Sequence, residues 1–295
     1  MMAEPLIAFR LLTLEVLRLS STRSLLLVFW IALPVHAQVQ PWGWDDGTVP
    51  YVQTPMEIVE RMLRMAEVKK GDHVIDLGSG DGRIVILAAK RFGARGLGIE
   101  IEPALVAKSR ENARNAGVES RASFREQDLF KTDLAPASVI TLYLLPEVNM
   151  QLRPKLLALR PGTRIVSHDF DMEDWEPDKT LTVDAPDKSI GLGKTSKVYL
   201  WIVPARVDGL WCGTGKARGK SITLSQRHQK VRIDAPGGAA VKALDARING
   251  NAILTRTKVL NLAYDGSRLR TTYAGGTMAG LKGATFARPK GQSCG

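Results

Sequence analysis

The sequence is poor in the residues that build most metal centres. It holds two cysteines, Cys212 and Cys294, and four histidines among 295 residues. None of them stands at a spacing typical of metal ligands, so we expect no metal site. The two cysteines allow one disulfide in an oxidising compartment, although two cysteines alone do not establish it.

A long apolar run is also lacking. The run from Leu25 to Leu33 is too short to cross a bilayer as a settled helix. Arginines precede it, Pro34 ends it, and Val35-His36-Ala37 resembles a cleavage site. We therefore predict a secretory signal peptide over residues 1–37, removed after Ala37, and an exported or periplasmic protein. The alternatives are a retained inner-membrane anchor or a buried core segment, and a cytoplasmic protein if the signal is misread.

Acidic residues are scarce in the last third of the chain. Residues 205–295 contain 16 lysines and arginines against four aspartates, a net charge of +12, whereas the first 204 residues carry −1. This imbalance either aids solubility or favours contact with an anionic surface. No specific nucleic-acid motif accompanies it.

Residues 51–204, after a Gly- and Pro-rich linker over 38–50, alternate helical and strand patterns. Thr54 and Pro55 suggest an N-cap and a first helical residue. The strands read as nearly unbroken apolar runs, which predicts an α/β fold with a mainly parallel, doubly wound sheet covered on both faces. The expected helices are 55–67, 82–92, 103–117 and 149–162, with Pro154 near the start of the last. The expected strands are 73–78, 96–101, 122–130, 138–144 and 163–170, followed by a late pair at 179–184 and 197–204.

Residues 205–295 change style. Apolar and polar residues alternate there, and no helical period is visible. Asn249-Gly250, Asp265-Gly266 and Gly275-Gly276 stand between such runs as hairpin-turn signals. We expect a small antiparallel β-rich domain, either a meander or a small barrel.

The most informative stretch is VIDLGSGDGRI, residues 74–84. It runs from a strand through a turn to a helix, which in an open parallel sheet is where ligands bind. Gly78, Gly80 and Gly82 let the backbone turn sharply and approach a ligand. The start of the next helix adds free N–H donors.

Two ligand classes compete for this loop. A dinucleotide site needs G-x-G-x-x-G, but Arg83 occupies the place of the third glycine. Asp76 would repel a pyrophosphate and attract an ammonium group. Glu100, at the end of the second strand, suits the two hydroxyls of a ribose, and Asp128 at the end of the third strand is placed to accept from an adenine amino group. These acids favour a nucleoside with a cationic head.

The D-x-G-x-G-x-G motif with these acids resembles class I S-adenosylmethionine-dependent methyltransferases, over about residues 51–203. The resemblance implies a Rossmann-like seven-stranded sheet with the last strand antiparallel, and S-adenosyl-L-methionine as the cofactor. It places the methionine part at the glycine loop, the ribose at Glu100 and the adenine between Asp128 and Leu129. The implied cofactor-binding residues are Asp76, Gly78, Ser79, Gly80, Asp81, Gly82, Glu100, Ile101, Asp128 and Leu129.

The segment YVQTPMEIVERML is similar to the lead-in of methyltransferases whose loop reads DLGSGDGR. Some of these enzymes methylate lysines in proteins, for example the mitochondrial enzymes that act on ATP synthase. The similarity implies that Tyr51 and Thr54 contact the cofactor, although Thr54 could equally be a simple helix N-cap. It suggests a protein lysine as the methyl acceptor. The alternatives are a small quinone- or lipid-like acceptor, or an envelope binding protein that has lost catalysis.

Acceptor groups are expected after the fourth strand. The Asn-Pro-Pro-Tyr pattern typical of many nitrogen methyltransferases is absent there, so adenine or glutamine N-methylation is not supported. Tyr143 could orient an acceptor or simply pack at the rim. His168 could act as a general base, although a hydrogen-bonded structural histidine is the better interpretation. Methyl transfer from a sulfonium to a neutral amine needs alignment more than it needs a base.

Overall fold

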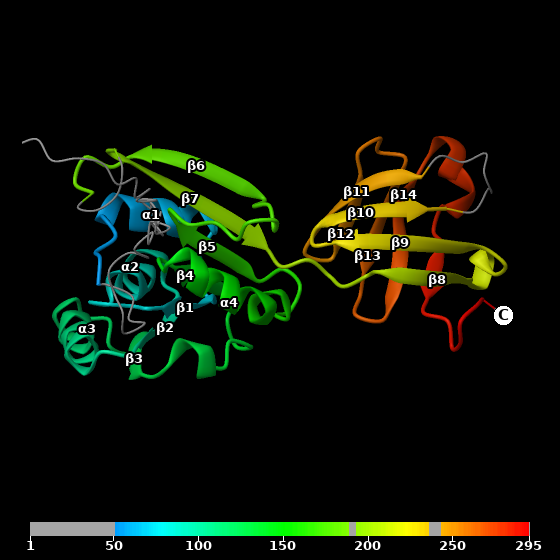
Figure 1. Cartoon of the computed structure of the whole chain (residues 1–295). Coiled ribbons are helices and arrows are strands. Elements are labelled where there is room, and N and C mark those ends of the chain that lie inside the picture. Colours follow the sequence, from blue (N-terminus) through cyan, green and yellow to red (C-terminus); the bar gives the residue numbers. More distant parts are fainter. Residues whose placement is uncertain (1–50, 189–192, 236–242, 295) are drawn as a thin grey trace, which may run out of the picture. The chain divides into compact units, whose positions relative to one another are not determined.

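The computed structural model describes residues 51–188, 193–235 and 243–294 (Figure 1). The predicted signal peptide over 1–37 and the linker over 38–50 lie outside these residues. Within them, no helix has both the length and the apolar character needed to cross a membrane.

The first part of the described chain is a seven-stranded sheet with the strand order β3-β2-β1-β4-β5-β7-β6. All neighbouring strands are parallel except β7, which runs antiparallel to both β5 and β6. The predicted doubly wound sheet with an antiparallel last strand is therefore confirmed. The strands are β1 (His73–Leu77), β2 (Arg95–Glu100), β3 (Ala122–Glu126), β4 (Val139–Leu142), β5 (Arg164–His168), β6 (Lys179–Asp184) and β7 (Thr195–Ile202).

Helices cover both faces of the sheet because apolar side chains point from it in both directions. On one face, the core joins α1 and α2 to the strands through residues such as Ile58, Ala88 and Val166. On the other face, Leu152 and Leu156 of α4 pack with Ile140 and Trp201. The helices are α1 (Met56–Met65), α2 (Arg83–Phe92), α3 (Pro103–Asn115) and α4 (Pro146–Leu157), with a 3-10 turn η1 (Leu129–Lys131).

Three local expectations about the sheet region are wrong. Pro55, not Thr54, is the N-cap of α1, and no side chain caps that helix. Pro154 lies inside α4 and not near its start. The helix starts at Pro146, where proline is tolerated because a first helical residue needs no partner for its N–H. The strand expected over 122–130 ends at Glu126, so Asp128 lies beyond it as the cap of η1.

The second part is a closed antiparallel barrel of eight strands in the order β10-β11-β12-β13-β14-β15-β8-β9. Its interior is filled by apolar side chains, with Trp211 and Phe286 among the largest. The barrel therefore has a packed core. The strands are β8 (Gly209–Thr214), β9 (Ser221–Arg227), β10 (Lys230–Asp234), β11 (Leu244–Asn249), β12 (Ala252–Thr255), β13 (Leu260–Tyr264), β14 (Arg268–Ala274) and β15 (Thr285–Ala287).

Two of the three predicted hairpin turns are present. Asn249-Gly250 joins β11 to β12, and Asp265-Gly266 joins β13 to β14. Both glycines have positive φ, as tight turns require. Gly275-Gly276 does not form a hairpin, because the chain enters the 3-10 helix η4 (Gly276–Leu281) there before it returns as β15.

An acidic segment after β5 pairs with basic residues of the barrel. Asp174 contacts Arg227 at 2.9 Å, and Asp178 contacts Arg247 at the same distance. Part of the barrel's positive charge is thus balanced within the chain itself.

The two cysteines form a disulfide between Cys212 and Cys294, which are 82 positions apart. Cys212 lies in β8, and Cys294 follows β15. These are the first and last strands of the barrel, and they pair with each other to close it. The disulfide therefore fastens the seam of the barrel.

We predict that replacing both cysteines by serine lowers the free energy of unfolding of the barrel by about 2–4 kcal/mol, because the open chain gains loop entropy in the unfolded state. Denaturant unfolding under oxidising conditions measures this loss. A reducing agent should lower the stability of the wild type to that of the variant and leave the variant unchanged. A wild type indifferent to reduction would contradict the prediction.

Candidate active site

The glycine loop lies where the strand order reverses between β1 and its neighbours β2 and β4. Gly80 has a φ of 53°, and a Cβ there would stand 2.5 Å from the Tyr51 ring. A Cβ on Gly78, with a φ of 75°, would stand 2.9 Å from Leu144. Only glycine allows this backbone to lie so close to its neighbours. The loop therefore presents bare backbone at the carboxyl ends of the strands, the usual ligand position in such sheets.

Asp76, the last residue but one of β1, is only 2% exposed. Its Oδ1 accepts a hydrogen bond from the Thr141 hydroxyl at 2.6 Å. Its Oδ2 is buried and has no partner among the described residues, and neither has the nearby Ser79 hydroxyl. Burial, with a smaller contribution from the charge of Glu100, raises the pKa of Asp76 to about 7. A buried acid with one unpaired oxygen is prepared for a cationic donor.

Glu100, at the end of β2, binds the loop from the other side. Its carboxylate accepts from the backbone N–H groups of Gly80 and Ile101, each at 2.8 Å. It therefore fixes the glycine loop against β2. The side chain of Ile101 is 61% exposed and offers an apolar surface beside this acid.

Asp128 has a different environment from the one expected. Its carboxylate accepts from the Phe130 N–H at 2.8 Å and lies 3.4 Å from the Lys131 ammonium. Leu129, in the first turn of η1, is partly buried. Leu129 and the exposed Phe130 directly follow this carboxylate in the chain. They offer apolar surface of the kind that packs against a flat ring.

The lead-in segment contacts the glycine loop through Arg83, which the sequence marked only as a missing glycine. Arg83 pairs with Asp81 at 2.6 Å and donates to the Thr54 carbonyl at 2.8 Å. Burial raises the pKa of Asp81, but the hydrogen bonds and the charge of Arg83 outweigh it and hold that pKa below its usual range. The ring of Tyr51 lies over Gly80. Asp81 is thus joined to the lead-in through Arg83.

The two residues predicted for the acceptor side follow β4 and end β5. In register, Leu77 of β1 is opposite Leu142, and Leu142 is opposite Ser167. Tyr143 and His168, each one residue further on, are consequently neighbours, with ring centroids 4.0 Å apart. Burial raises the pKa of Tyr143 to about 12, so its phenol is neutral.

His168 is fully buried. Its Nε2 lies 2.8 Å from the Ser196 hydroxyl, and its Nδ1 lies 3.4 Å from the Thr54 hydroxyl. Burial lowers the pKa of His168 to about 4, mainly because the charged form loses hydration. This is the environment of a neutral, hydrogen-bonded structural histidine. Thr54 is not the cap of α1 but links the lead-in to β5, and its predicted contact with the cofactor stays a prediction.

Several residues of this region carried no signal in the sequence. Thr141 holds Asp76, and Ser196 holds His168, but both look like ordinary strand residues. Asp169 follows β5 with a φ of 61°, which is unusual for a residue other than glycine. The one feature of the sequence that pointed to Asp169 is its place as an acid directly after a predicted strand.

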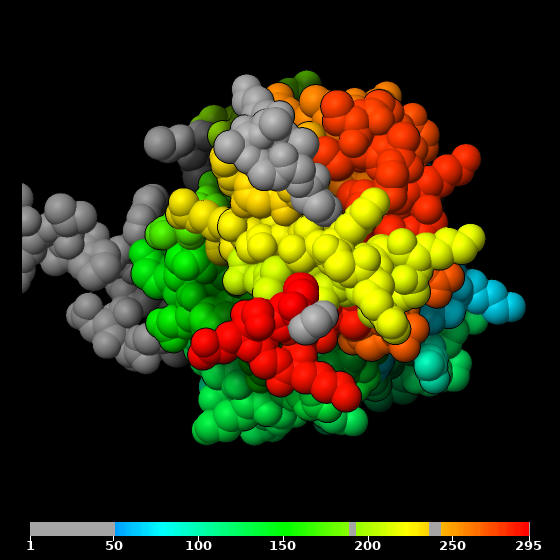
Figure 2. Space-filling view, turned by 90° about the vertical axis from the view of Figure 1, so that its right-hand side faces the viewer, coloured from blue at the N-terminus to red at the C-terminus, as the bar shows by residue number. Residues whose placement is uncertain are grey.

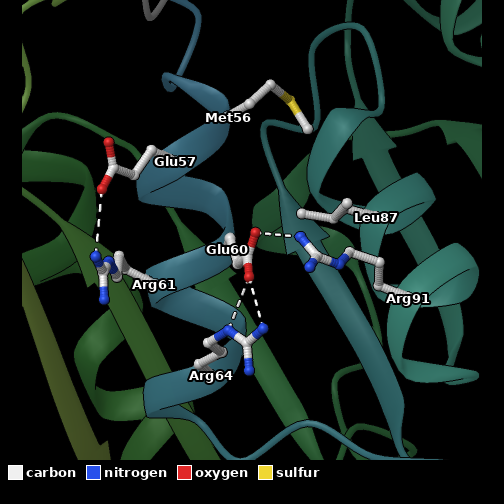
Figure 3. Close-up of a pocket in the computed structure, with 7 residues that line it drawn as sticks. All are labelled: Met56, Glu57, Glu60, Arg61, Arg64, Leu87 and Arg91. Atoms are coloured by element: carbon white, nitrogen blue, oxygen red, sulfur yellow. Dashed lines mark hydrogen bonds and ion pairs between the residues drawn. The ribbon is translucent and has the colours of Figure 1, made fainter.

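A separate hollow lies between α1 and α2 (Figure 3). Its charges are paired with one another: Glu60 contacts both Arg64 and Arg91, and Glu57 contacts Arg61. It contains none of the residues discussed above. Its charges stabilise the two helices and leave no unpaired carboxylate of the kind found at Asp76.

The ANTKMT methyltransferase domain model matches residues 76–179. A protein-lysine N-methyltransferase of Saccharolobus islandicus (strain REY15A) is 41% identical over 157 residues, which cover 52% of this chain and 94% of that protein. A lysine N-methyltransferase of Mus musculus, named for the C subunit of ATP synthase, is 39% identical, covering 60% of this chain and 74% of the relative.

Among solved structures, an RNA methyltransferase from Salinibacter ruber in complex with S-adenosyl-L-homocysteine is 52% identical. The match covers 53% of this chain and 96% of that chain, with a TM-score of 0.48.

The fold and the site define a class I S-adenosylmethionine-dependent methyltransferase. The chain belongs to the family of its protein-lysine N-methyltransferase relatives. The residues present fit the cofactor, because the unpaired buried oxygen of Asp76 and the bare loop at Gly78 and Gly80 suit an amino-acid ammonium group. The predicted class, an S-adenosylmethionine-dependent methyltransferase, is thereby confirmed. The individual cofactor contacts remain predictions.

We predict that Asp76→Asn weakens binding of S-adenosylhomocysteine by about 10- to 100-fold at pH 8, the usual effect of losing a charge-assisted hydrogen bond. Titration calorimetry measures the affinity. The same variant should make the ligand-free enzyme more stable at pH 8. Because the pKa of Asp76 is raised to about 7, its ionisation does not affect the free energy of unfolding below pH 4. It lowers this free energy progressively as the pH rises, and by the full amount above pH 7.

Thermal unfolding at pH 5 and pH 8 checks the second effect, which should be larger at pH 8. Asp133→Asn, at an exposed aspartate after η1, is the matched control and should change neither quantity. Unaltered ligand affinity in Asp76→Asn would show that this carboxylate does not face the cofactor.

Proposed function

We propose that this enzyme methylates the side-chain amine of a lysine in a protein acceptor. The observation that carries the proposal is the similarity, over nearly the whole length of the Saccharolobus relative, to a protein-lysine N-methyltransferase. The absence of an Asn-Pro-Pro-Tyr motif after β4 supports it, since the chain there reads Tyr143-Leu144-Leu145-Pro146.

When bound, the cofactor supplies an electrophilic methyl group on a sulfonium. In the proposal, Asp76 accepts from the ammonium of its amino-acid part, and the glycine loop lies along that part. Glu100 accepts from the ribose, while Ile101 and Leu129 pack beside the adenine near Asp128. Ser79, whose buried hydroxyl has no partner among the described residues, adds a further polar contact.

The protein's own contribution to the transfer is alignment and exclusion of water. The acceptor lysine loses one proton to water before the transfer, because only the neutral amine has a lone pair for the methyl group, and the product is a methylammonium ion; no protein base is needed. His168 has its two ring nitrogens next to Thr54 and Ser196 and is buried, so we assign it a positioning role for Tyr143. Tyr143, partly exposed at the end of β4, lies along the acceptor path.

The acceptor is tested with labelled S-adenosylmethionine and lysate of the source cells. We predict that label enters the protein fraction and is recovered as methyllysine after hydrolysis, and that Asp76→Asn strongly lowers the transfer when the cofactor is limiting. Label in the RNA fraction or in a lipid or quinone fraction would overturn the lysine assignment. Absence of any transfer by the folded wild type would favour a binding protein that has lost catalysis.

We further propose that the protein is exported and that its barrel contacts an anionic surface. The disulfide supports an oxidising compartment. The basic composition of residues 205–295 supports the surface contact. Arg227, Lys230 and Arg247 pair with Asp174, Glu176 and Asp178, so the contact relies on the remaining cations. Figure 2 shows this part of the molecule, from the yellow strands to the red C-terminal residues.

Fractionation of expressing bacteria tests both proposals. We expect a processed chain that begins at Gln38, found with the cell envelope and released by high salt, because screening weakens contacts between exposed charges. Mass spectrometry of the intact protein gives the start of the chain. An unprocessed protein in the cytosol would refute export, and an envelope fraction insensitive to salt would refute the electrostatic contact.

A further inference from the structure

Asp169 lies at the end of β5, next to the proposed acceptor path. Its Oδ2 is 2.7 Å from the ammonium nitrogen of Lys188, and both side chains are largely buried, with 15% and 9% of their surface exposed. Lys188 lies in the segment between β6 and β7 and also donates to the Thr195 carbonyl at 2.9 Å. The Asp169 carboxylate at the end of β5 therefore binds a lysine ammonium group of the same chain.

The Asp169 carboxylate is held rigidly. Its Oδ1 accepts from the Lys197 N–H at 2.9 Å, and its own N–H donates to the Lys197 carbonyl at 2.7 Å. These two bonds to β7 maintain the positive φ of Asp169. Oδ2 remains for a cation, because the nearby His168, at 3.4 Å, is neutral. The carboxylate is thus preorganised with one oxygen available.

Aromatic rings flank this carboxylate. Tyr143 stacks with Phe170, the residue after Asp169, at a centroid distance of 6.4 Å, and its ring lies tilted against His168 at 4.0 Å. The charge of Asp169 contributes to the raised pKa of Tyr143, which agrees with their proximity. An acid beside neutral rings is a suitable receptor for the head of a lysine, whose apolar stem packs on the rings.

Structural stability gives little reason for this arrangement. A largely buried ion pair costs desolvation of both charges, and a well-packed apolar pair is often as stable. Among the described residues, Lys188 is the one charged partner of Asp169 in a salt bridge. The pair therefore has the chemistry of a recognition site that is filled from within the chain.

We propose that Asp169 is the specificity residue that receives the ammonium group of the acceptor lysine before this group loses a proton to water, and that Lys188 occupies this position in the resting enzyme. This inference rests on the proposed lysine acceptor. An incoming lysine must displace Lys188, whose side chain then acts as an internal competitor. The apparent affinity for an acceptor amine is reduced by the fraction of time that Lys188 is in place.

The test uses the full chain loaded with S-adenosylhomocysteine and n-butylammonium as a probe of the lysine head. We expect Lys188→Met, which keeps an apolar stem, to bind the probe about tenfold more tightly than the wild type, if Lys188 is in place about nine-tenths of the time. Adding Asp169→Asn should abolish this gain, since asparagine keeps the bond from Lys197 but loses the charge. Calorimetry measures both affinities.

Matched controls exclude general effects. Lys108→Met and Glu111→Gln alter an exposed pair on α3 and should leave probe binding unchanged. Neutral n-pentanol, of similar length, should not distinguish the variants. Unaltered binding of S-adenosylhomocysteine shows that each variant is folded. The inference is overturned if Lys188→Met binds the probe no better than the wild type, or if the double variant binds it as well as Lys188→Met.

Turnover separates this inference from the proposed function. With N-acetyl-lysine methylamide as acceptor, Lys188→Met should lower KM about tenfold with little change in kcat, and adding Asp169→Asn should raise KM again. If lysine is methylated but Asp169→Asn leaves KM unchanged, the role of Asp169 is refuted and the proposed function stands. If no variant methylates lysine while n-butylammonium binding follows Asp169 as expected, the ammonium site stands and the lysine acceptor fails.

Discussion

The architecture of the candidate site depends on one buried carboxylate. Asp76 lies near the end of the inner strand β1, where one oxygen is satisfied by Thr141 and the other is left without a partner among the described residues. Such a group costs stability in the ligand-free fold, so its retention is explained by a ligand that supplies the missing donor. The glycine loop beside it leaves room for that ligand.

A polar chain joins the cofactor side of the sheet to the acceptor side. Arg83 bonds Asp81 of the glycine loop and the Thr54 carbonyl, and the Thr54 hydroxyl in turn meets His168 behind Tyr143. The lead-in thus contacts both halves of the site. These hydrogen bonds, among partly and fully buried groups, hold the lead-in, the glycine loop and the end of β5 together.

The sequence predicted the sheet well because buried parallel strands read as apolar runs, and glycines and acids at their ends have few other uses. The sequence did not predict individual side-chain contacts where a polar group had several possible hydrogen-bond partners. Thr54 looks like a helix cap but bonds His168, and Asp128 caps a 3-10 turn beyond its strand. Asp169 and Lys188 are far apart in sequence, so only the antiparallel return of β7 brings them together.

The two parts of the chain solve their folding problems differently. The sheet buries apolar residues on both faces, while the barrel has a core formed by one face of each short strand and adds a disulfide across the seam between its first and last strands. A small domain gains more from such a crosslink, because it buries less apolar surface per residue. The barrel can therefore carry a large surplus of positive charge, whose repulsion the disulfide and the acidic segment around Asp174 offset.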